Sequence, residues 1–138
     1  MRDLQKEYER MVEKQSLIAY TVMVQRTDGK WMFLVQQDLS DFLFPGIQTV
    51  NNMNSTGLSS VIEVLKRDLD LNFNKLELIE LTNAIYEKER LPLFVFKYHC
   101  GTQRPSQLLL PHSNLEWQVS DRFKETIQRY EISGVPLF

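Results

Sequence analysis

Charged side chains gather in one eight-residue stretch of the sequence, which contains Glu63, Arg67, Asp68 and Asp70. If this stretch is helical, a turn of about 100° per residue places Val64, Arg67 and Asp68 on one flank. A flank with several carboxylates would hold magnesium, because this hard cation binds oxygen ligands. Here the flank offers one aliphatic side chain, one cation and one anion. We therefore expect this flank to bind a divalent cation poorly.

These charged residues also have simpler structural interpretations. Glu63 and Arg67 are four residues apart, a spacing at which opposite charges on a helix contribute only about 0.2 to 0.5 kcal/mol. Asp68 is interpreted as a solvated residue or as a partner of Arg67. We assign no catalytic residue and no metal ligand. If any residues of this stretch take part in catalysis, the candidates are Asp68 and Glu63. The candidate metal ligand is Asp68.

Histidine and cysteine chemistry is not expected. His99 and His112 do not lie at the spacing of metal ligands. Cys100 follows His99 directly in a predicted strand, where neighbouring side chains point to opposite faces, so the two do not form a catalytic pair. The remaining acids would replace missing ligands only if several converged on one ion; they include Glu77, Glu80, Glu87, Glu89 and Glu116.

The elements that position the charged stretch follow from the spacing of apolar residues. A helix with one buried face is predicted by a stripe at helical spacing, formed by Leu58, Val61, Ile62, Leu65 and Leu69. Ser55 or Thr56 can cap its start. β-rich runs at 17–25 and 31–37 flank Asp28-Gly29, a pair that suits a tight hairpin turn.

The rest of the chain continues this alternation of elements. Strands are predicted at 76–81, 93–100 and 115–119, and a last helix at 120–130. Loops are predicted at 48–57 and 101–111, which are rich in polar residues, glycine and proline, and a charged turn at 87–90. The predicted fold class is α+β, with a mixed sheet flanked by helices.

The composition is typical of one soluble globular domain. The chain has 138 residues, of which 43% are hydrophobic and 25% charged, so residues 1–138 are treated as a single domain. A net charge of −2 lacks the basic excess of a protein that binds nucleic acid or an anionic membrane. Cys100 is the sole cysteine, so no internal disulfide forms, and we expect a cytoplasmic location.

An amphipathic helix is predicted at the N-terminus, over residues 1–16. Leu4, Tyr8, Met11 and Val12 share one face of this helix, and charged side chains occupy the other. The apolar face needs burial, either on the body of the domain or against a second copy in a homodimer.

One junction, together with the order of elements around it, is distinctive. The predicted hairpin leads to a Phe44-Pro45-Gly46 turn, a polar loop and a capped helix follow, and the segment 116–119 precedes the last helix. This arrangement resembles the Nudix family over residues 18–130. The resemblance implies an α/β/α sandwich and a magnesium-dependent hydrolase that cleaves a nucleoside diphosphate linked to another moiety.

The Nudix signature, G-x5-E-x7-R-E-U-x-E-E-x-G-U with U an aliphatic residue, supplies the carboxylates that bind magnesium. Along the predicted helix, Glu63 stands in place of the signature arginine, Val64 in place of the next glutamate and Arg67 in place of the following one. Asp68 keeps an acid at its position, whereas Ser55 stands at the upstream glutamate. The Nudix box is therefore interpreted as degenerate.

Two hypotheses about function follow. The first is a catalytically impaired Nudix-like domain that binds a nucleotide or a related small metabolite, or a protein partner. The alternative is an active hydrolase that uses magnesium with relocated acidic residues. For either function we expect a pocket between the 44–46 turn, the loop after it and the strand at 93–98, with Phe44, Gly46 and Arg67 as ligand-binding residues.

Overall fold

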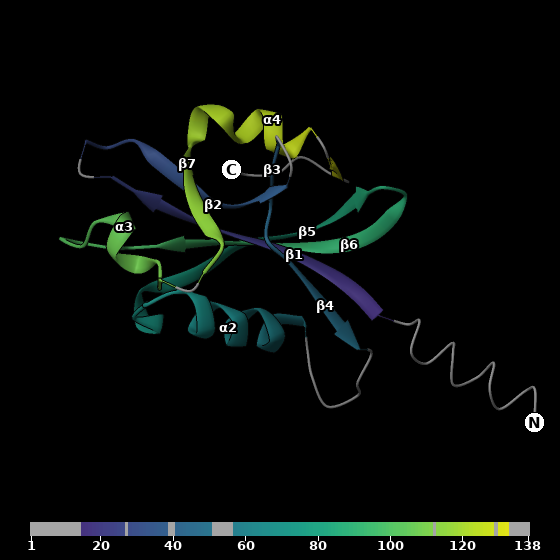
Figure 1. Cartoon of the computed structure of the whole chain (residues 1–138), viewed down its shortest axis with the longest axis horizontal. Helices are drawn as coiled ribbons and strands as arrows, with labels where there is room; N and C mark the ends of the chain where they lie inside the picture. The colour runs from purple at the N-terminus through teal and green to yellow at the C-terminus, as the bar shows by residue number, and fades with distance from the viewer. Residues whose placement is uncertain are drawn as a thin grey trace, which may run out of the picture.

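The computed structural model describes residues 15–26, 28–38, 41–50, 57–111, 113–128 and 130–132. The helix predicted over residues 1–16 lies outside them except for Gln15 and Ser16, which begin the first strand instead. The elements, in chain order (Figure 1), are β1 (Gln15–Gln25), β2 (Trp31–Asp38), β3 (Asp41–Leu43), β4 (Gly46–Val50), α2 (Gly57–Asp68), the 3-10 turn η1 (Phe73–Lys75), β5 (Leu76–Tyr86), β6 (Glu89–Tyr98), α3 (Pro105–Leu108), β7 (Leu115–Val119), the 3-10 turn η2 (Ser120–Arg122), α4 (Phe123–Ile127) and β8 (Glu131–Ile132).

The strands of the described residues form one eight-stranded mixed sheet. Its main order is β3-β2-β1-β6-β5-β8, with β4 added to β1 and β7 added to β2. β1 and β6 are parallel, in a register that runs from Ala19 opposite Leu93 to Val24 opposite Tyr98. The other pairs are antiparallel. The carboxyl ends of β1 and β6 therefore open at the same edge of the sheet.

Strand β1 changes its antiparallel partner halfway along its length. It pairs with β4 from Gln15 to Ala19 and with β2 from Met23 to Gln25. At the crossover, the hydroxyl of Thr21 donates to the carbonyl oxygen of Leu34 at 2.8 Å and accepts from its N–H at 3.1 Å. Thr21 is fully buried. Its hydroxyl therefore provides hydrogen-bond partners for the N–H and the carbonyl oxygen of Leu34, which water does not reach here.

Both faces of the sheet are covered by helices, as Figure 1 shows with α2 below and α4 above the strands. On one face the buried stripe of α2 packs on the central strands through Val61, Leu65 and Leu69. On the other face the core contains Phe33 and Tyr130, with Phe123 of α4 packed against it. The predicted α+β class, a mixed sheet flanked by helices, is confirmed.

Most of the predicted elements appear with shifted ends. The strand predicted at 76–81 extends to Tyr86, and the turn after it is shorter than the predicted 87–90, because Glu87 and Lys88 alone form it with φ of 50° and 69°. The loops predicted at 48–57 and 101–111 are wrong in part. Residues 48–50 belong to β4, which joins β1 through backbone bonds that need no apolar pattern, and 105–108 form α3.

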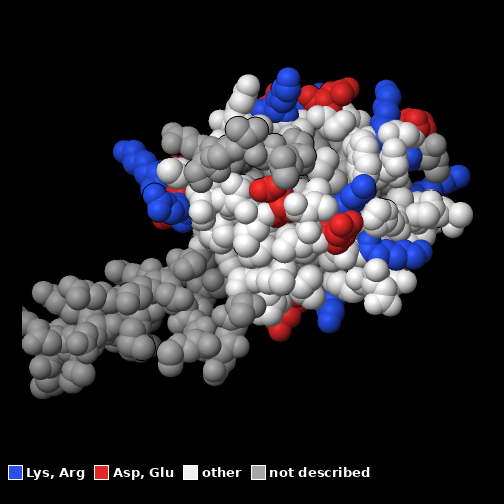
Figure 2. Space-filling model, turned by 180° about the vertical axis from the view of Figure 1, so that it is seen from behind, with Lys and Arg blue, Asp and Glu red and all other residues white. Residues whose placement is uncertain are grey.

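Charges are mixed over the surface. On the face shown in Figure 2, positive and negative side chains are interspersed and much of the area is uncharged. This distribution agrees with the net charge of −2. Within the described part of the chain, no helix has the length and apolarity that a membrane crossing requires.

Candidate functional site

Helix α2 positions the charged stretch that the sequence singles out. Val61 and Leu65 are completely buried under the helix, which fixes its rotation about its own axis. The neighbouring flank consequently carries Val64, which packs against the core, together with Arg67 and Asp68. These three residues therefore lie on one flank of α2, as predicted, because the buried residues Val61 and Leu65 set the orientation of the helix.

Arg67 and Asp68 form a two-bond ion pair at the end of α2. The Arg67 Nε donates to Asp68 Oδ1 at 3.1 Å and its Nη2 donates to Asp68 Oδ2 at 3.0 Å. The side chain of Asp68 is 10% exposed, whereas that of Arg67 is 67% exposed. Hydrogen bonds from Arg67 to the carboxylate, and the attraction between the two charges, raise the pKa of Arg67. The interpretation of Asp68 as a partner of Arg67 is confirmed, although Asp68 is buried rather than solvated.

A buried phenol completes this group. Tyr20 lies in the middle of β1, is 2% exposed and is close enough to Asp68 for the two to interact electrostatically. Burial and the negative charge of Asp68 raise the pKa of Tyr20 well above its usual value. Tyr20 is therefore neutral near pH 7. The group consists of a neutral phenol, a carboxylate and a guanidinium that solvent reaches.

The donor set on this flank does not fit a magnesium ion. Magnesium needs several oxygen ligands at about 2.1 Å, but both carboxylate oxygens of Asp68 already accept hydrogen bonds from Arg67. Val64 offers no ligand atom, and a guanidinium repels a cation. Among the described residues, no group of three or more histidine, cysteine, aspartate or glutamate side chains is arranged to hold a metal. Ser55, at the upstream position of the signature, lies outside these residues.

The other predicted site residues are distributed over both faces of the sheet. Glu63 is exposed on α2. Gly46 begins β4 opposite Ala19 and is exposed. Phe44 is 3% exposed and belongs to the core on the α4 face, where its ring lies 5.0 Å from that of Tyr130. The structure therefore does not bring Phe44 and Arg67 together, and their binding of a ligand stays a prediction.

A cavity that the sequence did not indicate opens at the carboxyl ends of β1 and β6. Its volume is about 360 Å³, and it is lined by Gln25, Arg26, Trp31, Lys97, Tyr98, His99, Cys100 and Gly101. The Cys100 thiol donates to the carbonyl oxygen of Gln25 at 3.4 Å and so ties the two strand ends together. This cavity and the pocket predicted from the sequence have only the end of strand 93–98 in common.

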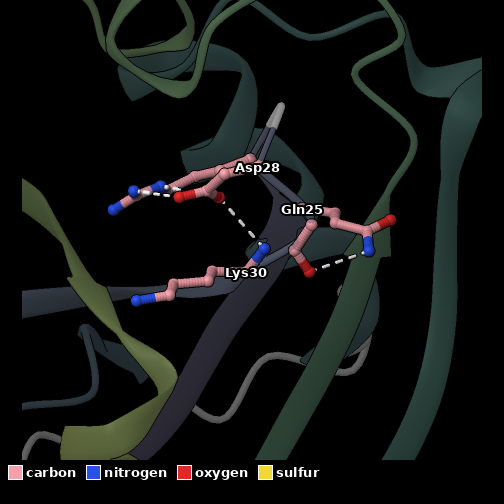
Figure 3. A network of polar contacts seen from close by, with 5 residues as sticks. Gln25, Asp28 and Lys30 are labelled. Carbon is pink, nitrogen blue, oxygen red and sulfur yellow. Dashed lines mark hydrogen bonds and ion pairs between the residues drawn. The ribbon is translucent and has the colours of Figure 1, made fainter.

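Polar contacts in the β1–β2 turn hold one wall of this cavity (Figure 3). The amide nitrogen of Gln25 donates to the carbonyl oxygen of Gly29 at 3.0 Å. Asp28 accepts from the backbone N–H of Lys30 at 3.1 Å and forms an ion pair with Arg26. Gly29 has a φ of 85°, as expected for the second residue of the Asp-Gly turn. The turn therefore fixes the backbone from which Arg26 extends.

The sequence did not indicate this cavity because its walls are distant in the chain. Arg26 and Trp31 come from one hairpin, whereas Lys97 and His99 come some seventy residues later, so only the β1–β6 pairing brings them together. The signal available in the sequence was the nearly continuous apolar run at 93–98, which is typical of a central strand covered on both faces. That run predicted a central strand but not which strand lies beside it.

The fold is similar to that of several known proteins. An Ap4A hydrolase from C. elegans matches with a TM-score of 0.57 and 13% identity, over 83% of this chain and 86% of that one. A Nudix hydrolase from M. smegmatis, RenU, matches with a TM-score of 0.51 and 9% identity, over 81% and 74%. A structure of the complex between the C-terminal domain of mouse MUTYH and human PCNA matches with a TM-score of 0.52 and 15% identity, over 81% and 77%.

Sequence comparison adds no assignment, since no family model and no curated protein matches the chain. Identities of 9 to 15% establish similarity of architecture and nothing finer. The chain thus has the fold of the Nudix hydrolases.

Proposed function

We propose that the chain is a Nudix-fold binding module without hydrolytic activity, and that its ligand is a nucleotide or a related small metabolite. One observation carries the first half of this proposal. Asp68, the acid that remains in the degenerate Nudix box, is buried and has both carboxylate oxygens hydrogen-bonded to Arg67. A carboxylate engaged in this way is a poor metal ligand and a poor general base.

The choice of ligand rests on the fold and on charge. One similar structure is an Ap4A hydrolase, whose name describes a substrate made of nucleosides joined by phosphates. Arg67 presents a guanidinium that is 67% exposed, and guanidinium groups suit phosphate oxygens through paired hydrogen bonds. Affinity for phosphate without a bound metal favours binding over turnover.

The decisive experiment is a hydrolysis assay against a panel of dinucleotides and nucleotide sugars, with magnesium and with manganese. Asp68→Asn is the test variant, and Asp70→Asn is the matched control, because Asp70 is an exposed acid two residues further along the chain. We expect no appreciable turnover by any of the three proteins. Turnover on the order of 1 s⁻¹ that Asp68→Asn abolishes and Asp70→Asn retains would show an active, magnesium-dependent hydrolase and refute the proposal.

Binding is tested separately by thermal denaturation with the same compounds in the presence of a chelator. A ligand at one hundred times its Kd contributes about 2.7 kcal/mol, which for a chain of 138 residues raises the Tm by about 9 °C. A rise with at least one nucleotide, in the absence of metal, is the expected result. Rises that occur only after magnesium is added would contradict a metal-independent module.

A protein partner is a second candidate ligand. Strand β5 exposes three large apolar side chains, Leu78 at 41%, Ile79 at 36% and Leu81 at 54%, and one similar structure is a complex between two proteins. A second copy of the chain is the simplest such partner. Analytical ultracentrifugation of the wild type and of Leu81→Ser tests it: a dimer that the substitution dissociates supports the candidate, and a monomer at all concentrations removes the homodimer.

A further inference from the structure

The cavity at the carboxyl ends of β1 and β6 is separate from the flank of α2. Asp68 lies beside Tyr20, whereas the cavity begins at Gln25, five residues further along β1. At a rise of about 3.3 Å per residue, this separation is about 16 Å along the strand. A ligand in the cavity therefore meets different residues from one held by Arg67.

The charge of the cavity is positive. Arg26 and Lys97 are among its lining residues, and none of the eight lining residues is acidic. Lys75 adds a third cation at the rim, since its Nζ lies 4.0 Å from the point where a Cβ on Gly101 would stand. Two exposed acids lie next to this lining: Asp28 pairs with Arg26, and Glu77 lies opposite Lys97 on β5.

Polar hydrogen-bonding groups accompany these cations. His99 lies on the wall, where its Nε2 is 3.6 Å from Glu77 Oε2. Gln25 lines the cavity from the adjacent end of β1, with its amide nitrogen donating to the Gly29 carbonyl oxygen. Cations with several donors around a space of about 360 Å³ are what a phosphate group requires, because it has several strong acceptor oxygens.

An aromatic wall lies beside the cationic one. The ammonium of Lys97 lies 5.1 Å from the ring centroid of Trp31, a distance at which a cation is attracted to the ring face. This contact holds Lys97 in place in the cavity lining. Trp31 is partly exposed, so its indole also offers apolar surface to the organic part of a ligand.

We infer that this cavity binds a small phosphate ester whose organic part is an aromatic ring, with the phosphate at Arg26 and Lys97 and the ring against Trp31. The parallel pairing of β1 with β6 explains why residues from the ends of both strands line one cavity. The inference does not depend on whether α2 supports hydrolysis. ADP is a suitable probe because it combines a diphosphate with a purine ring.

The test is an NMR titration of the ¹⁵N-labelled full chain, in a chelator, with three probes: ADP, inorganic pyrophosphate and adenosine. The chain has two tryptophans, and their indole N–H signals report on two places. Trp31 lies in the cavity, whereas the indole of Trp117 donates to the Pro105 carbonyl oxygen at 2.8 Å elsewhere. We expect ADP to shift the Trp31 signal and to leave that of Trp117 in place, with a Trp31→Phe variant providing the assignment.

Two lysine variants locate the ligand. Lys97→Gln removes a cation from the cavity and is expected to raise the Kd for ADP about tenfold or more. Lys66→Gln is the matched control, because Lys66 also lies over an aromatic ring, with its Nζ 5.4 Å from the centroid of Phe73, but belongs to α2. The control is expected to bind ADP like the wild type, and circular dichroism verifies that both variants fold.

The outcomes separate this inference from the proposed function. Weak binding of pyrophosphate and none of adenosine, beside tighter binding of ADP, supports both parts of the site. Equal binding of pyrophosphate and ADP overturns the aromatic part, and equal binding of adenosine and ADP overturns the phosphate part. Binding of ADP that Lys97→Gln leaves unchanged and Arg67→Gln weakens overturns the cavity site while it upholds a binding module. No shift of the Trp31 signal with any probe overturns the inference outright.

Discussion

Replacing Thr21 by valine tests how the sheet is held together at the point where β1 exchanges β4 for β2. Thr21 is completely buried, and its hydroxyl makes two hydrogen bonds to the backbone of Leu34, at 2.8 and 3.1 Å. Valine has almost the same shape but no hydroxyl. Thr21→Val therefore leaves the N–H and the carbonyl of Leu34 buried without this partner and changes the packing little.

The expected magnitude follows from those two groups. A buried polar group that loses its partner costs about 1 to 3 kcal/mol, so the two together cost about 2 to 6 kcal/mol. The added methyl of valine returns about 1 kcal/mol. A net loss of about 3 kcal/mol would be a large part of the 5 to 15 kcal/mol typical of a domain. For a chain of 138 residues, it lowers the Tm by about 10 °C.

Thr21→Ser is the matched control, since serine keeps the hydroxyl and removes one methyl, at a cost of about 1 kcal/mol. Urea denaturation followed by circular dichroism measures the free energy of unfolding of all three proteins. We expect the wild type to be most stable and Thr21→Val least. If Thr21→Val is as stable as Thr21→Ser, the hydroxyl does not hold the two strands together and the reasoning is wrong.

Three further predictions concern the α2 face. Leu65→Ala, at a completely buried position, should destabilise the protein by about 3 kcal/mol in urea, whereas Leu58→Ala, at a position 41% exposed on the same helix, should cost far less. Burial raises the pKa of Tyr20 in the folded state above the ordinary value of 10.0, so the stabilisation that the neutral phenol provides is fully present below pH 10. Above pH 10, the free energy of unfolding of the wild type, compared with that of Tyr20→Phe, should fall by up to about 1.4 kcal/mol per pH unit. Magnesium at about 10 mM should leave the Tm of the wild type unchanged. It should raise the Tm of a double variant, Val64→Glu with Arg67→Glu, because this variant places carboxylates on the flank.

Elements with a strong local pattern were predictable. Asp28-Gly29 indicated the β1–β2 turn because glycine adopts a positive φ, as Gly29 does here, without steric cost. The stripe that includes Leu65 indicated α2, because one buried face repeats at the helical period. In both cases the information lies within about a dozen adjacent residues.

Features that depend on distant pairing were not predictable. β4 has no apolar alternation and is a strand because β1 supplies its backbone partners. The sequence did not indicate that the ring of Phe44 is buried beside Phe33 and Phe123, which come from other parts of the chain. The cavity requires β1 and β6 to lie in parallel. None of these contacts leaves a periodic trace in the sequence.

The Arg67–Asp68 pair connects the fold to the proposed loss of catalysis. Burial of a carboxylate requires a compensating cation close by. In the family that this chain resembles, the signature assigns that part of the helix to carboxylates and magnesium, whereas here Arg67 supplies the positive charge from the adjacent position. The packing of α2 depends on Val61 and Leu65, and neither side chain belongs to the Arg67–Asp68 pair. Under the proposed function, a guanidinium in the place of a metal ion would leave the fold intact and remove the electrostatic basis for activating a water.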